Sequence, residues 1–321
     1  MGRTGFKILS WSPWPIQVSM GVLGVVSSFI SSVHSGMGLL SLVAALASWI
    51  VLVGSLFCWW SDMVFEGNHK GDFTSRIKRN LQWGFVMFVV SEVFFFSSFF
   101  SSWYYFGVGE NSQVLMGSWP PVGIVPVYPW KIPTLNTVLL LSSGVCVSWC
   151  QKCVQAMSMA KDSEFSKMVM VDRWEKLKFT SAKKMLVSLA KLVKKLSDQS
   201  AIEKKWLLGL RRQALLSMFL TISLGVIFMY LQSLEYRWAS VTFSDSTYGG
   251  CFYILTGFHG LHVILGICFL SVCWVRIYLN NFMFEATLDV GLDCAILYWH
   301  FVDVVWIGVY GSVYLWPYFV G

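Results

Sequence analysis

The sequence predicts an all-α integral membrane protein that crosses the bilayer seven times. Two observations carry this prediction. First, 56% of the 321 residues are hydrophobic and only 13% are charged, whereas a soluble globular chain carries about 25% charged residues. Second, several apolar stretches exceed the roughly 20 residues that a helix needs to span the hydrocarbon core. A soluble domain of this length could not bury so much apolar surface, so the excess must face lipid.

The expected spans follow the apolar stretches in chain order. They cover residues 16–36, 38–60, 81–106, 134–152, 213–232, 247–276 and 295–318. The first two are joined so closely around Gly36 that they should form an antiparallel hairpin. All eight prolines lie outside these spans or near their ends. We therefore expect none of the mid-membrane helix breaks that many ion-coupled transporters contain.

Basic residues are distributed unevenly between the two sides that seven spans create. One side collects twenty-two Lys and Arg residues, fifteen of them in segment 152–212, and the other side collects only Lys131 and Arg237. Lys and Arg favour the cytoplasmic or matrix side of a membrane. The N-terminus should therefore face the matrix or cytoplasm, and the C-terminus the opposite side. The net charge of +7 then reports topology, and no nucleic-acid partner is indicated.

Four parts of the chain are expected from these spans. They are an N-terminal hairpin (1–60), helices three and four with their loops (61–151), a basic insertion (152–212) and helices five to seven (213–321). Within the insertion, residues 182–197 should form an amphipathic helix, because leucines and lysines fall on different faces. Such a helix suits an anionic membrane surface or a docking site for an accessory protein, and both interpretations remain open.

Ionisable residues inside spans are costly and are candidates for function. The sequence places Glu92 near the middle of the third span, where no Lys or Arg accompanies it. We expect Glu92 to be a protonated acid, because desolvation disfavours the charged form. It could relay protons, or it could simply hydrogen bond to a neighbouring helix.

Four further ionisable residues form two pairs at helical spacing. His259 and His262 lie one turn apart, as do His300 and Asp303. A His-x-x-His pair could bind a metal, but the chain has five histidines in all and no Cys-x-x-Cys-His motif. We therefore expect no metal or haem site and a polar network that ties helices together. The eight cysteines mostly lie in apolar stretches, where thiols behave as small hydrophobes, so no disulfide framework is indicated.

Five ordered motifs resemble subunit III of the haem–copper cytochrome c oxidases. They are Ser12–Pro15 at the start, Ser91–Phe96 in the third span, Trp119–Ile124 with Pro133–Thr137 before the fourth span, Thr256–Val263 in the sixth and Tyr298–Trp306 in the seventh. The resemblance covers the chain except for about fifty residues within 152–212, which look like an insertion.

This resemblance implies a core subunit of a proton-pumping oxidase that passes electrons from cytochrome c to O2. Haem and copper would lie in partner subunits, with subunit I as the main contact and subunit II and accessory subunits in the same complex. The first two helices would splay from the other five around a cleft filled with phospholipid, including anionic lipid. The chain would lie in the mitochondrial inner membrane with its N-terminus in the matrix and its C-terminus in the intermembrane space, or in a bacterial plasma membrane.

Residue by residue, the resemblance assigns phospholipid contacts to Trp60, Glu66 and Arg276, and it makes Glu92 the buried carboxylate beside the cleft. The chain departs from the family at several positions: Phe65 replaces an arginine, Phe73 and Val125 replace histidines, Asp289 stands where histidines are usual, and Asp293 replaces a glutamate. The lost cationic groups should alter lipid contacts on the basic side.

Three alternatives are weighed against this interpretation. A quinol oxidase subunit III is the nearest, since the electron donor would bind to another subunit. A channel or transporter would need polar faces on several spans and broken helices, and neither pattern is present. A free-standing enzyme would need a convergent catalytic set, which the sequence also lacks.

Overall fold

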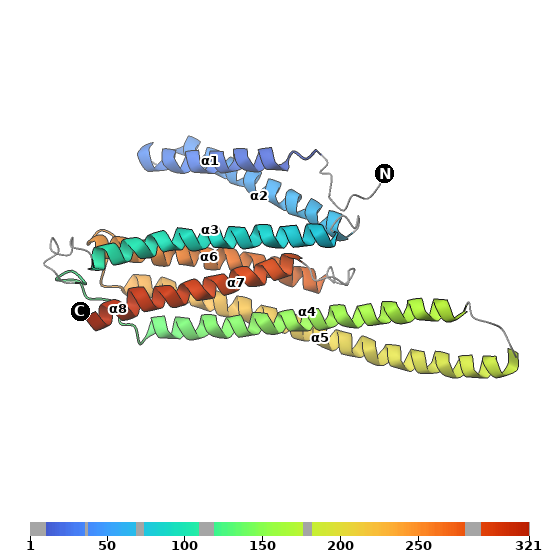
Figure 1. The fold of residues 1–321 in the computed structure, drawn as a ribbon. Coiled ribbons are helices and arrows are strands. Elements are labelled where there is room, and N and C mark those ends of the chain that lie inside the picture. The colour runs from blue at the N-terminus through green and yellow to red at the C-terminus, as the bar shows by residue number, and fades with distance from the viewer. Residues whose placement is uncertain are drawn as a thin grey trace. The chain divides into compact units, whose positions relative to one another are not determined.

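The computed structural model describes residues 11–35, 38–68, 74–108, 119–175, 182–279 and 290–320, and only the backbone over 160–175 and 182–204. The described residues form helices, with turns and irregular backbone at 119–131 and 239–246 (Figure 1). These helices are α1 (Trp14–Ser35), α2 (Leu39–Asn68), α3 (Ser75–Val108), α4 (Ile132–Glu175), α5 (Ala182–Trp238), α6 (Thr247–Tyr278) and α7 (Val290–Val309), followed by a π-helical turn η3 (Tyr310–Leu315) and α8 (Trp316–Val320).

Seven stretches of the described helices are long and apolar enough to cross a membrane, so the predicted fold class is confirmed. They lie in α1 to α7, and the last continues through η3 and α8 to Phe319. Pro15 and Pro133 each occupy the second residue of their helix. Proline is tolerated there because the first N–H groups of a helix have no partner within it. The first and fourth expected spans, which begin at residues 16 and 134, therefore start within two residues of α1 and α4.

Contacts divide the chain into a first unit, Met1–Leu81, and a second unit, Gln82–Gly321. In the first unit, α1 and α2 form the predicted hairpin. A Cβ atom on Gly21 would lie 2.9 Å from the Cα atom of Leu52, so only glycine permits this close approach of the two backbones. Trp14 Nε1 near the start of α1 donates a hydrogen bond of 2.7 Å to Asp62 Oδ2 near the end of α2. This contact shows that the two helices are antiparallel.

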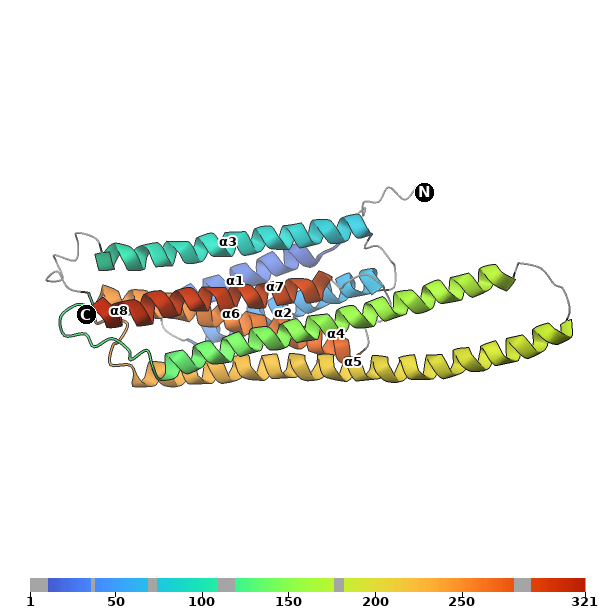
Figure 2. The ribbon, with the colours of Figure 1, turned by 60° about the horizontal axis from the view of Figure 1, so that its bottom comes forward.

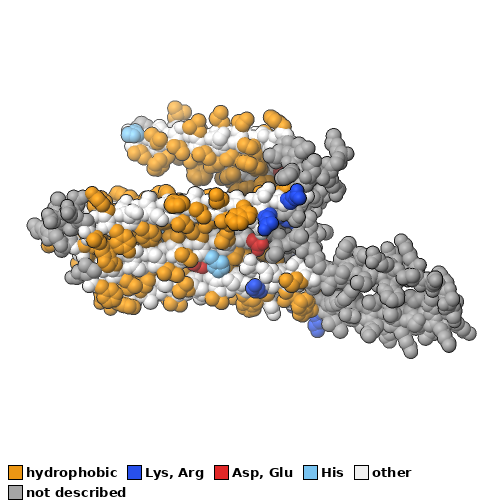
Figure 3. All heavy atoms as spheres, in the orientation of Figure 1, with side chains coloured by type: hydrophobic (Ala, Val, Ile, Leu, Met, Phe, Trp, Pro, Cys, Tyr) orange, Lys and Arg blue, Asp and Glu red, His pale blue; other side chains and the backbone are white. Residues whose placement is uncertain are grey.

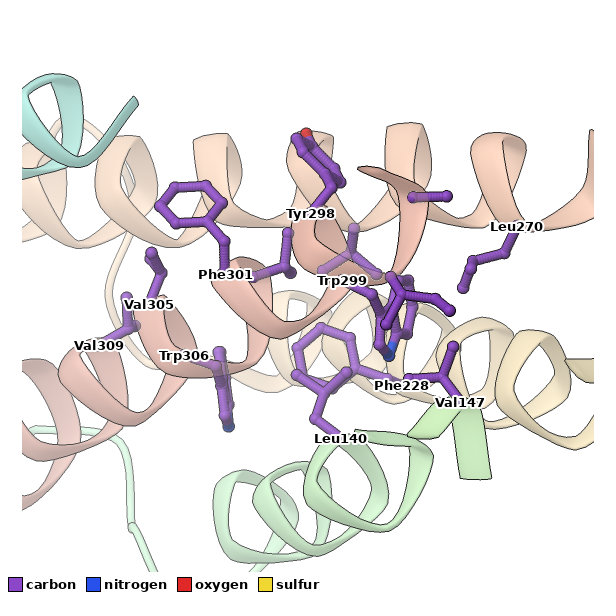
Figure 4. Packing of buried hydrophobic residues seen from close by; sticks show 14 of the residues in the cluster. Leu140, Val147, Phe228, Leu270, Tyr298, Trp299, Phe301, Val305, Trp306 and Val309 are labelled. Atoms are coloured by element: carbon purple, nitrogen blue, oxygen red, sulfur yellow. The ribbon is translucent and has the colours of Figure 1, made fainter. Parts of the chain in front are cut away.

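In the second unit, four helices meet on the side chain of Trp299 (Figure 4). Trp299 on α7 is fully buried. Cβ atoms added to Gly225 on α5 and Gly266 on α6 would each come within 2.8 Å of its ring. Its indole Nε1 donates a 2.9 Å hydrogen bond to Ser143 Oγ on α4. The two glycines therefore form the pocket that this tryptophan fills.

Helices α4 and α5 run side by side beyond the ends of the other helices of their unit (Figures 1 and 2). They contain 44 and 57 residues, which at 1.5 Å per residue makes them roughly 65 and 85 Å long. The boundaries expected at 151 and 212 fall inside these continuous helices, so segment 152–212 is not separated from the spans.

Residues 182–197 are helical, as expected, and they belong to the unbroken helix α5, which also contains the fifth span. The helix is continuous here because neither glycine nor proline occurs between 182 and 208, so no residue there favours a turn. The choice between lipid and partner contact concerns side chains that lie outside the described residues.

Exposed serines lie between residues 91 and 102 of α3. Their hydroxyl groups donate hydrogen bonds of 2.6 to 3.0 Å to carbonyls three or four residues earlier in the same helix, as seen for Ser91, Ser97, Ser98, Ser101 and Ser102. Bonding of this kind satisfies the hydroxyl within its own helix. These serines therefore need no partner from a neighbouring helix.

Candidate functional site in the polar contacts between helices

Glu92 on α3 is paired with His262 on α6. The distance from Glu92 Oε2 to His262 Nε2 is 3.0 Å, and His262 Nδ1 lies 2.8 Å from the carbonyl oxygen of Phe258. A carbonyl oxygen can only accept, so Nδ1 must carry a proton. The remaining contact then needs one proton between Nε2 and Oε2. Whichever atom holds that proton, the pair has no net charge.

Sequence reasoning named both residues but did not predict that they meet across 170 positions. Aromatic rings enclose the imidazole of His262. The ring centre of Phe96 lies 4.9 Å from that of His262, and Tyr298 stacks on the imidazole at 6.2 Å. A pair without net charge suits these apolar surroundings, because an unpaired charge would be strongly disfavoured there.

His259 links α6 to α7. Its Nε2 donates to the carbonyl oxygen of Val302 at 3.2 Å, and the imidazole is 1% exposed between the rings of Phe228 and Trp306. Nδ1 has no hydrogen-bond partner among the described residues. His259 and His262 therefore share a helix but bind different neighbours, and across the described residues no group of three potential ligands could hold a metal ion.

His300 and Asp303 lie on α7 where it packs against α4. We call Gly144, Ser148, His300 and Asp303 the α4–α7 seam. His300 Nδ1 is 3.7 Å from Asp303 Oδ2, and His300 Nε2 is 3.2 Å from Ser148 Oγ. Gly144 makes room for the carboxylate, since a Cβ atom there would lie 2.7 Å from Asp303 Oδ2. Asp303 is 6% exposed and its Oδ1 has no hydrogen-bond partner within the described chain.

The seam contains serine, histidine and aspartate side chains, but it does not have the geometry of a hydrolase triad. Ser148 Oγ donates its only proton to the carbonyl of Gly144 at 2.9 Å, so this proton is not directed at the imidazole. The 3.7 Å between His300 and Asp303 is also longer than a hydrogen bond. A triad nucleophile must give its proton to the histidine. The seam is therefore a contact between helices.

A second buried acid, Glu235 near the end of α5, was missed by sequence reasoning because the expected span ended at residue 232. Glu235 is 3% exposed, and Tyr314 OH donates to its Oε1 at 2.6 Å. A signal for it was available. Glu235 follows the fully buried Phe228 by seven residues, and this spacing places both on one face of a helix.

The residues expected to bind phospholipid occupy two parts of the chain. Trp60, 49% exposed, and the partly buried Glu66 lie on α2 in the first unit. Arg276 lies in the last turn of α6 in the second unit. Lipid binding at these residues stays a prediction, as does the cleft between the first two helices and the others.

Two departures from the family pattern, Phe73 and Asp289, lie outside the described residues. A third, Asp293, is in the first turn of α7 and accepts a 3.1 Å hydrogen bond from Gln151 Nε2 on α4. This aspartate therefore joins α4 and α7.

Long apolar helices and polar groups paired between them define a class, that of multi-span membrane proteins built around helix contacts. Comparison with known proteins gives the family. The family model of cytochrome c oxidase subunit III matches residues 4–193 and 202–318. Cytochrome c oxidase subunit 3 of Dugong dugon is 34% identical over 311 residues, and that of Ornithorhynchus anatinus is 35% identical over 311 residues. Each alignment covers 97% of this chain and 97% of the relative.

The chain belongs to the cytochrome c oxidase subunit III family. It is accordingly a subunit of a terminal oxidase complex, as the sequence motifs predicted. The matched ranges omit only residues 194–201 of the segment 152–212.

Proposed function

We propose that this chain is a non-catalytic core subunit of the mitochondrial oxidase and that it packs against the catalytic subunit I. Electron transfer from cytochrome c to O2, and the associated proton pumping, would take place at haem and copper held by partner subunits. Membership of the family supports the general role. The α4–α7 seam is the observation that supports the contact with a partner.

The seam interrupts a surface that is otherwise suited to lipid. On α7 the outward residues Leu297, Val304 and Ile307 are 40%, 66% and 49% exposed, and Figure 3 shows a mainly hydrophobic face with a histidine and acidic groups within it. His300, whose side chain is 41% exposed, lies on α7 among these outward residues. An exposed imidazole is costly against hydrocarbon. A membrane helix of a partner that brings a hydrogen-bonding group would cover this imidazole, and we assign this role to subunit I.

The test is the stability of the association between this chain and subunit I. In the intact oxidase, His300→Ala should weaken retention of the chain during detergent washing, because a buried hydrogen bond lost to a partner costs about 1–3 kcal/mol. Val304→Ala, one turn away on the same face, is the matched control and should retain the chain. A photoreactive residue at position 304 should crosslink to subunit I. Crosslinks to lipid alone, or equal retention of both variants, would contradict the proposed contact.

The orientation in the membrane is part of the same proposal. The twenty-two basic residues of one side against two of the other support an N-terminus in the matrix and a C-terminus in the intermembrane space. Single cysteines introduced as Gly2→Cys and Gly321→Cys should react with an impermeant reagent from opposite sides. Labelling of both introduced cysteines from the same side would refute this orientation.

Two further parts of the proposal follow from the family. Trp60, Glu66 and Arg276 would contact phospholipid head groups, and the chain itself would bind no haem or copper. Metal analysis of the purified chain tests the second part, and a stoichiometric metal would contradict it. Lipid analysis tests the first part, and a lipid content that is unchanged in Arg276→Ala would contradict it.

A further inference from the structure

A completely buried polar cluster lies where α4 begins and α5 ends. It comprises Asn136 on α4, Gln232 and Glu235 on α5, and Tyr314 in η3, and each is at most 3% exposed. Within the described chain, Glu235 forms no salt bridge with Lys or Arg. The cluster is therefore a set of polar groups without a compensating positive charge.

The hydrogen bonds of this cluster all run in one direction. Asn136 Nδ2 donates to Gln232 Oε1 at 3.2 Å, and Gln232 Nε2 donates to Tyr314 OH at 3.3 Å. Tyr314 OH donates to Glu235 Oε1 at 2.6 Å, and Gln232 Nε2 also approaches this oxygen, at 3.4 Å. The donors therefore converge on a single oxygen of the carboxyl group.

Two buried atoms remain at the ends of this chain of hydrogen bonds. Asn136 Oδ1, at the first member, and Glu235 Oε2, at the last, have no hydrogen-bond partner among the described residues. A buried polar atom left unsatisfied costs about 1–3 kcal/mol. Asn136 Oδ1 can only accept. An ionised Glu235 would place a second pure acceptor at the other end, together with an uncompensated buried charge.

We infer that Glu235 is a proton-binding site, held as a neutral carboxylic acid with its proton on Oε2, and that one buried water molecule joins it to Asn136. The Oε2–H group donates to the water, and the water donates to Asn136 Oδ1. Asn136, Gln232, Tyr314, Glu235 and the water then form a closed ring in which each member donates to the next. This assignment satisfies both unpartnered atoms, as buried waters commonly do. It is independent of the contact with subunit I.

The infrared spectrum of the purified oxidase tests the protonation. The isosteric Glu235→Gln variant should lose one band of a protonated carboxyl group relative to the wild type. Tyr314→Phe keeps the acid but removes the donor to Oε1, so its band should persist and move to higher frequency. Measuring all three in a Glu92→Gln background removes the contribution of the other glutamate. Identical spectra for the wild type and Glu235→Gln would mean an ionised Glu235 and would overturn the inference.

The water has its own test. In a high-resolution map of the oxidase complex, one water should lie within hydrogen-bond distance of both Asn136 Oδ1 and Glu235 Oε2. In Asn136→Leu the acceptor is lost, so the water should be absent and the carboxyl band should shift without disappearing. Direct contact of the two side chains, or density for a cation in place of water, would refute the ring.

Discussion

Replacing Trp299 with alanine should lower the free energy of unfolding by about 3–5 kcal/mol, because it leaves a large cavity in the core. The ring fills a pocket made by Gly225 on α5 and Gly266 on α6, and its Nε1 bonds to Ser143 on α4. Three helices would therefore lose their contact with α7 at one point. The effect is measured by heating the purified oxidase and recording the temperature at which this chain is released.

Two matched variants sharpen this measurement. Trp149→Ala removes a tryptophan that is 46% exposed on α4, so its cost should be much smaller. Trp299→Phe keeps most of the packing but loses the hydrogen bond to Ser143, and it should fall between the two. Equal denaturation temperatures for Trp299→Ala and Trp149→Ala would show that Trp299 does not hold the four helices together.

Glu92→Leu is expected to cost about 1–3 kcal/mol, because it leaves the buried Nε2 of His262 without a partner. Glu92→Gln should cost less, since its amide N–H can still donate to Nε2. The double variant Glu92→Leu with His262→Leu should be more stable than the sum of the two single effects predicts. Denaturation of the wild type, the two single leucine variants and the double variant measures the coupling energy. Additive effects would show that Glu92 and His262 do not interact.

A separate prediction concerns the proton that Glu92 and His262 share. We expect the proton on Glu92 and a neutral His262, because an apolar environment favours two neutral groups over two charges. The infrared spectrum of Glu92→Gln should then lose a protonated-carboxyl band, while turnover of the oxidase stays mostly intact. Identical spectra for the wild type and Glu92→Gln in the protonated-carboxyl region would place the proton on His262 instead.

The seven spans could be predicted because a helix that crosses the hydrocarbon core needs an apolar stretch of about 20 residues, and such stretches are visible in the sequence. The pairing of Glu92 with His262 could not be predicted. A helix that is apolar on most sides has a weak hydrophobic periodicity, so its sequence does not show which side faces which neighbouring helix. Hydropathy could not predict the lengths of α4 and α5 either. An apolar stretch ends where lipid ends, whereas the backbone hydrogen bonds of α5 continue through a segment without glycine or proline.

Glu235 shows a different limit. It fell outside the expected span 213–232, because polar residues lower the mean hydropathy of a window even where they are buried and hydrogen bonded. Its seven-residue spacing from Phe228 was the better guide. The ring of contacts around it depends on Tyr314, which reaches the site from η3, 79 residues further along the chain. Such a meeting is a property of the packed helices.

The exposed serines of α3 form a surface whose hydroxyl groups need no partner outside the helix. Each hydroxyl hydrogen is already occupied by a carbonyl of the same helix, so exchanging an acyl chain for a protein side chain against it breaks no hydrogen bond. Hydrogen bonding then favours neither neighbour, and shape and dispersion forces decide which one stays. This serine surface can keep a boundary lipid or release it at little enthalpic penalty.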